Sequence, residues 1–197
     1  MSQKTSTLYY LKQPRLLTNL IIMCLIWLSS SFCYYLILIL SNTFDNCYTA
    51  GIINGSSELI AYFLAGIIYE RIGVKLTLII SFLLSTVGGL LILFWGLHHQ
   101  GSPLFSVFFL LAKFGVTITL LTNYAANSYF FPVLFSATAM GICNFLARFF
   151  SAFSYLVDKI EEPFPMIMFT GMCALSAVAA LLLRTDKRKQ TATKLEE

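Results

Sequence analysis

Three charged residues interrupt long apolar stretches of the sequence: Glu58, Lys113 and Arg148. Burying a charge near the centre of a bilayer costs about 2.5–3.5 kcal/mol on insertion scales, so such residues usually face a partner or an interior cavity. Glu58 can pair with either basic residue, and a pairing of this kind could simply hold the helices together. In both cases one of the two basic residues is left without an acidic partner. This unpaired positive charge predicts an aqueous cavity or an anionic ligand.

Helical spacing places each of these charges among small or polar residues. Residues three or four positions apart share one face of a helix, and such faces usually contact other helices when they are small or polar. We therefore expect the three charges to point to a shared interior. The neighbours on these faces are Asn54, Gly55 and Tyr62 around Glu58, Thr117, Tyr124 and Asn127 after Lys113, and Gly141, Asn144 and Ser151 around Arg148.

The composition indicates which kind of protein must carry these residues. The chain has 197 residues, of which 58% are hydrophobic and 11% charged, against about 45–50% and 25% in an ordinary soluble domain. This excludes a cytosolic globular enzyme and a disordered chain, and it predicts an all-α polytopic membrane protein with the lipid bilayer as its surroundings. The net charge of +4 is too small to indicate a nucleic-acid partner.

A transmembrane helix needs roughly 20 mainly apolar residues, and six stretches qualify. They are preceded by a short segment, 1–15, and followed by a basic tail, 184–197. The sequence therefore predicts a membrane domain over 16–183 with six transmembrane helices. Their expected ranges are 16–40, 47–69, 76–97, 103–126, 132–156 and 163–183.

The distribution of basic residues predicts the orientation. An even number of spans places both ends of the chain on one side of the membrane, and cytoplasmic loops carry an excess of Lys and Arg. The opposite side receives Lys159 alone. We therefore expect both termini to be cytoplasmic. The basic residues on their side are Lys4, Lys12, Arg15, Arg71, Lys75, Arg184, Lys187, Arg188, Lys189 and Lys194.

Motifs of covalent or cofactor chemistry are missing from the sequence. It contains no G-x-S-x-G, no H-E-x-x-H and no Walker loop. The five cysteines form no C-x-x-C pair and have no histidines at metal spacing, so we interpret them as packing residues. We expect no enzyme activity, metal or cofactor. An intramembrane enzyme with Glu58 as proton acceptor is the remaining enzymatic alternative.

Several motifs follow one another in an order that resembles a known transporter family. Trp27, Ser31 and the pair Tyr34-Tyr35 resemble a W…S..YYG pattern in which Leu36 replaces the glycine. Further matches are Glu70-Arg71-Ile72-Gly73-Val74-Lys75 to a D-R-x-G-R-R loop, Ala112-Lys113-Phe114-Gly115 to a G-K-G pattern, Ala147-Arg148-Phe149-Phe150-Ser151 to A-R-x-G-S, and 163–171 to a P…P…F…G pattern. Taken together they resemble the carboxyl-terminal six-helix half of a major facilitator superfamily transporter, specifically an organic ion transporter.

The resemblance implies a fold, a function and a site. It implies half of a major-facilitator-type fold, located in the plasma membrane, that transports a small organic solute by alternating access. Arginine at position 148 is typical of the anion-transporting branch. The resemblance implies that Lys113, Arg148, Tyr34 and Tyr35 bind the substrate, and Glu58 would balance charge when the site is empty. The cytoplasmic loop motif corresponds to Glu70, Arg71, Gly73 and Lys75, whereas Tyr129 and Ser136 replace an acid and an arginine of the family pattern.

A transporter of this superfamily has two six-helix halves around a central site, and this sequence resembles one of them. We expect either a fragment of a longer transporter or a half that assembles as a homodimer or with a separate amino-terminal half. The alternative is a non-transporting membrane partner or structural subunit derived from a transporter half.

Overall fold

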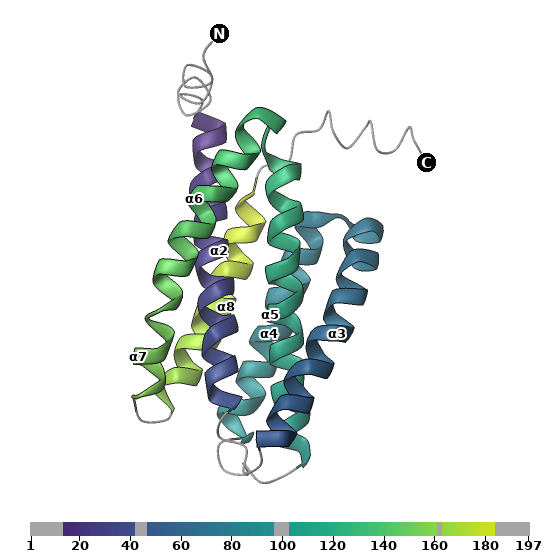
Figure 1. Ribbon diagram of the computed structural model, residues 1–197, viewed down its shortest axis with the longest axis vertical. Coiled ribbons are helices and arrows are strands. Elements are labelled where there is room, and N and C mark those ends of the chain that lie inside the picture. Colours follow the sequence, from purple (N-terminus) through teal and green to yellow (C-terminus); the bar gives the residue numbers. More distant parts are fainter. Residues whose placement is uncertain (1–13, 42–46, 97–102, 161–162, 184–197) are drawn as a thin grey trace.

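The computed structural model describes residues 14–41, 47–96, 103–160 and 163–183, and their regular structure is helical throughout (Figure 1). The amino-terminal segment, the basic tail and the connection 98–102 lie outside the described residues. The helices are α2 (Pro14–Leu40), α3 (Cys47–Ile72), α4 (Val74–Phe94), α5 (Pro103–Phe130), α6 (Val133–Ser151), α7 (Ser154–Asp158) and α8 (Phe164–Leu182).

Five of the described helical stretches are long and apolar enough to cross a membrane, which makes the chain a polytopic membrane protein. They are α2 from Leu16, α4, α5, the combined stretch Val133–Asp158, and α8. Helix α3 has 26 residues and is about 39 Å long at 1.5 Å per residue. It is not among the five stretches, which are drawn from the described residues. The sixth span therefore stays a prediction.

Two predicted connections are wrong in their extent. The break expected over 127–131 is helical as far as Phe130, because this segment contains no proline or glycine and the first proline after it is Pro132. The loop expected between Glu70 and Lys75 shrinks to Gly73, whose φ of 83° is readily adopted by glycine alone. This residue lets α4 begin directly after α3.

The span expected over 132–156 is also interrupted. Helix α6 ends at Ser151, and α7 begins at Ser154 after a turn at Ala152 and Phe153. The hydroxyl of Ser154 donates to the carbonyl of Ser151 (2.6 Å), which stabilises the turn. Arg148 consequently lies in the last turn of α6 and not in the middle of a continuous helix.

Helix α2 lies at the centre of the bundle and packs against α5, α6 and α8. Its fully buried side chains include Met23, Trp27 and Ile37. Helix α4 packs against α5 and α8, whereas α3 packs mainly against α5. The start of α2 and the end of α8 lie at the same end of the bundle, together with the α3–α4 and α5–α6 connections (Figure 1). Lys113 and the tyrosines of α2 are thereby placed in the interior.

Small residues hold α4 and α5 close together. A Cβ atom on Gly88 would lie 2.6 Å from the backbone nitrogen of Ala112, and one on Gly115 would lie 2.4 Å from the hydroxyl oxygen of Ser85. Membrane helices approach this closely where small residues replace large ones. The contact surrounds Lys113 in sequence, and it therefore fixes the face of α5 that carries the lysine.

The cysteines that the structure describes with their side chains are free thiols in helix interfaces. The sulfur of Cys24 on α2 lies 3.4 Å from that of Cys143 on α6. Cys33 on α2 lies 3.7 Å from Cys173 on α8. The interpretation of these four as packing residues is confirmed.

Candidate functional site

Lys113 and Glu58 form an ion pair inside the bundle. The ammonium nitrogen lies 3.1 Å from Glu58 Oε1, with the lysine side chain fully buried and the glutamate side chain 27% exposed. The hydroxyl of Tyr34 donates to the same carboxylate oxygen (2.6 Å), and the ammonium lies 4.0 Å from the centre of the Tyr34 ring. Of the two pairings that the sequence left open, the structure has Glu58 with Lys113.

The pair joins three helices, because Tyr34 comes from α2, Glu58 from α3 and Lys113 from α5. A buried charge is tolerated where an opposite charge and a hydrogen bond compensate it. The carboxylate receives both here, and the ammonium gains a cation–π contact with the tyrosine ring. The two formal charges cancel, so this part of the site is neutral.

Arg148 has a different environment. Its guanidinium donates a hydrogen bond to the hydroxyl of Tyr35, and its Nε lies 3.4 Å from the amide oxygen of Asn144. Within the part of the chain that the structure describes, Glu58 is the carboxylate engaged in the site and no carboxylate lies within ion-pair distance of Arg148. The carbonyl end of α6 favours a cation in its last turn. Arg148 therefore carries the net positive charge of the site.

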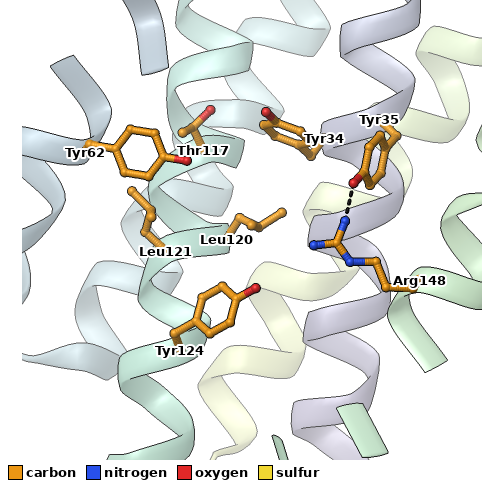
Figure 2. Close-up of a pocket in the computed structure, with 8 residues that line it drawn as sticks. All are labelled: Tyr34, Tyr35, Tyr62, Thr117, Leu120, Leu121, Tyr124 and Arg148. Atoms are coloured by element: carbon orange, nitrogen blue, oxygen red, sulfur yellow. Dashed lines mark hydrogen bonds between the residues drawn. The ribbon is translucent and has the colours of Figure 1, made fainter. Parts of the chain in front are cut away.

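A pocket of about 230 Å³ lies beside Arg148, between side chains from α2, α3, α5 and α6 (Figure 2). Figure 2 shows the guanidinium pointing between the tyrosine rings. The rings of Tyr34 and Tyr35 meet edge to face at 5.4 Å, so these neighbours connect the ion pair to the arginine. The lining residues are Tyr34, Tyr35, Tyr62, Thr117, Leu120, Leu121, Tyr124 and Arg148.

Three of the four predicted substrate-binding residues line this pocket: Tyr34, Tyr35 and Arg148. Lys113 is placed differently, since among the described side chains it contacts Glu58 and the Tyr34 ring and does not line the pocket. Its ammonium supports the wall that Tyr34 forms.

Part of the remaining pocket wall was predictable from the sequence. Thr117 and Tyr124 follow Lys113 at helical spacing, and Tyr62 follows Glu58 by four residues, so all three were expected on polar faces. Leu120 and Leu121 carried no signal, because leucine is common in every span of this sequence. Only the packing of the helices identifies them as part of the pocket.

The predicted cytoplasmic loop motif lies away from the pocket. Gly73 follows the pocket-lining Tyr62 by 11 residues, which corresponds to about 16 Å along a helix. The ammonium of Lys75 donates to the carbonyls of Leu181 and Leu183, both at 2.8 Å. A lysine at the end of a helix stabilises its unpaired carbonyls. Lys75 thus attaches the start of α4 to the end of α8, whereas Glu70 and Arg71 are exposed.

The sequence matches no model of a known protein family.

Proposed function

We propose that the chain is one half of a membrane carrier that binds a small organic anion and moves it by alternating access. The observation that carries the proposal is the guanidinium of Arg148, which faces a tyrosine-lined pocket and lacks a carboxylate partner among the described residues. A cation in a low-dielectric environment attracts an anion strongly. No covalent step is required.

The pocket suits the organic part of a small solute. Tyrosine rings and two leucines supply an apolar wall, and the hydroxyls of Tyr62 and Tyr124 add polar groups at its edge. Pockets for drug-sized ligands typically measure roughly 300–1,000 Å³, so a volume of about 230 Å³ favours a smaller molecule. An aromatic or branched monocarboxylate has the required chemistry, with its carboxylate on Arg148 and its body against the rings.

The proposal includes a sixth span formed by α3. Its length exceeds the thickness of the hydrocarbon core, which is about 30 Å. It buries Ala61 and Ala65 against Ile118 of α5, and its outward side carries large apolar residues such as Phe63, which is 73% exposed. That pattern is typical of a helix that contacts lipid on one side and protein on the other. With six spans, the unequal distribution of basic residues between the two sides would place both termini in the cytoplasm. The resemblance implies that the membrane is the plasma membrane.

Alternating access needs a second wall opposite the pocket. Tyr62, which lines the pocket, is 57% exposed, and Arg148 is exposed as well. The resemblance to half of a major facilitator transporter supplies a candidate wall in a separate amino-terminal half, or in a second copy of this chain. In either assembly Arg148 would face the interface at which the solute is bound.

The same exposed pocket supports a second candidate function. A polypeptide partner that presents an acidic side chain could occupy it permanently, and the chain would then be a non-transporting membrane subunit. Binding without transport distinguishes this candidate from a carrier.

The test uses the purified full chain in liposomes, alone and with a supplied amino-terminal half of an organic ion transporter. Binding and uptake of radiolabelled benzoate are compared with those of benzylammonium, which has similar size and the opposite charge. The proposal predicts saturable benzoate binding in either preparation and uptake in the assembled one. Benzoate binding with no uptake in any assembly would favour the non-transporting subunit, and equal binding of both probes would contradict the site.

A further inference from the structure

Beyond the pocket, α2 and α5 bury a set of polar atoms that the protein does not satisfy. Among the described residues, the indole N–H of Trp27, the amide oxygen of Asn123 and both amide atoms of Asn127 have no hydrogen-bond partner. All three side chains are almost completely buried. Buried polar groups in proteins are nearly always paired with protein or with ordered water, and water is scarce in a bilayer. These atoms therefore need an occupant.

Contacts link part of this set to the pocket. Tyr124 lines the pocket and meets the ring of Trp27 edge to face at 4.7 Å. The amide nitrogen of Asn123 donates to the hydroxyl of Ser30 (2.6 Å), which itself donates to the carbonyl of Trp27 (3.1 Å). Asn127 follows one helical turn beyond Asn123 on the same face of α5.

The contacts show that the two helices run antiparallel along these residues. Lys113 contacts Tyr34, and Asn123, further along α5, contacts Ser30. The residue numbers rise along α5 while those of the α2 partners fall. From Thr117 in the pocket to Asn127 the distance along α5 is about 15 Å, or half of the hydrocarbon core of a bilayer. The buried rings of Phe130 and Phe131 follow at the far end. Tyr124, which lines the pocket and contacts Trp27, is therefore the residue that connects the pocket to these buried polar groups.

The chemistry of the four atoms selects the occupant. The indole and the amide NH₂ need acceptors, whereas the two amide oxygens need donors. A bound metal cation would satisfy the oxygens and would leave the N–H groups directed at a positive charge. Water donates and accepts, and a buried water needs two to four polar partners. We infer that ordered water molecules occupy the α2–α5 interface between Tyr124 and Asn127, so that the pocket continues into a hydrated branch.

This inference does not depend on which solute the pocket binds. The waters would bridge Trp27 to the two asparagines, which explains how polar residues are accommodated between two membrane helices without direct pairing.

The two tryptophans of the chain, Trp27 and Trp95, make a direct test possible. The full chain is labelled with ¹⁵N-tryptophan in detergent micelles, and Trp95→Phe assigns the two indole signals. The inference predicts an exchange cross-peak between water and the Trp27 indole N–H. Asn127→Leu removes the two amide atoms that would hold the water and fills their space with an apolar side chain. The exchange rate between water and the Trp27 indole N–H should then fall by at least about tenfold.

Thr119→Val is the matched control. Thr119 is buried on the same helix, and its hydroxyl already donates to the carbonyl of Gly115 (3.0 Å), so its loss should leave the exchange of Trp27 unchanged. If Asn127→Leu does not fold, Asn127→Ser serves instead, because a smaller polar residue leaves room for water and should keep the cross-peak.

Two results would overturn the inference. The first is a Trp27 indole that shows no exchange with water in the unsubstituted protein. The second is a saturable shift of the Trp27 signal when sodium chloride replaces choline chloride, which would assign the branch to a cation. An unchanged signal in both salts supports water.

Discussion

The two basic residues of the site, Lys113 and Arg148, have opposite environments within one bundle. Lys113 is fully buried, lies 3.1 Å from a carboxylate and contacts a tyrosine ring. Arg148 is exposed, sits at the carbonyl end of α6 and donates to the hydroxyl of Tyr35. The first charge is compensated inside the protein and joins helices, whereas the second has no carboxylate partner among the described residues. In the proposed function, burial and pairing, and not charge alone, distinguish the structural cation from the one that binds the anion.

The largest expected effect is on stability and arises at the Lys113 side. Glu58→Gln leaves a buried ammonium without a counter-charge, which we expect to lower the free energy of unfolding by about 3–5 kcal/mol. Unfolding by sodium dodecyl sulfate in mixed micelles, followed by circular dichroism, measures the change.

The combination of Glu58→Gln with Lys113→Met is the matched control for that variant. It removes both charges and keeps the volume of the lysine stem, so most of the stability should return. An unfolding free energy that is the same in Glu58→Gln and in the parent would show that the ion pair does not hold the helices together.

The next largest effect concerns binding and arises at Arg148. Arg148→Ala removes the charge-assisted hydrogen bonds to an anion, each worth about 1.5–3 kcal/mol, so the loss of even one of them corresponds to roughly 10- to 150-fold in affinity. Equilibrium binding of radiolabelled benzoate measures it. Because the side chain is exposed, the unfolding free energy should change by no more than about 0.5 kcal/mol. A large loss of stability with unchanged affinity would reverse the roles of the two cations.

A smaller effect is expected from Arg148→Lys, which keeps the charge and loses the planar pair of donors. Lysine binds a carboxylate as a point charge, whereas arginine can hold both of its oxygens. We expect this variant to recover about half of the binding free energy that Arg148→Ala loses. The same benzoate assay applies, and full recovery would mean that charge alone is recognised.

The smallest effects separate the two neighbouring tyrosines. Tyr35→Phe removes the hydroxyl that accepts from Arg148, and we expect a change in benzoate affinity of about 0.5–1.5 kcal/mol. Tyr34→Phe removes the donor to Glu58, so its effect should appear in the unfolding free energy and hardly in affinity. Binding and unfolding measured on both variants test this, and identical behaviour of the two would remove the distinction between the two sides of the site.

Much of the fold could be predicted from the sequence because membrane helices are long apolar runs. The ranges of α2 and α8 agree with the predicted spans to within two residues. The break at Ala152 and Phe153 could not be predicted, since neither residue disfavours a helix and the turn is fixed by hydrogen bonds such as that of Ser154. The loop predicted between Glu70 and Lys75 is reduced to Gly73, because one residue with positive φ is enough to connect two helices.

The residues of the candidate site were easier to predict than the way in which they are arranged. Charges in apolar runs identified Glu58, Lys113 and Arg148, and helical spacing added Tyr62 and Thr117. The pairing of Glu58 with Lys113 depends on how α3 packs against α5, which the pattern along a single helix does not encode. For the same reason the sequence placed Lys113 in the binding site, while the structure puts Tyr34 between its ammonium and the pocket.

The most direct test of the central claim is the charge preference of the pocket when Arg148 is reversed. Benzoate and benzylammonium binding are measured on the parent chain, on Arg148→Asp and on the neutral pair variant Glu58→Gln with Lys113→Met. The account predicts that the parent and the pair variant both prefer benzoate, and that Arg148→Asp prefers benzylammonium. A preference for benzoate that persists in Arg148→Asp and disappears in the pair variant would contradict the account, because the binding charge would then be Lys113.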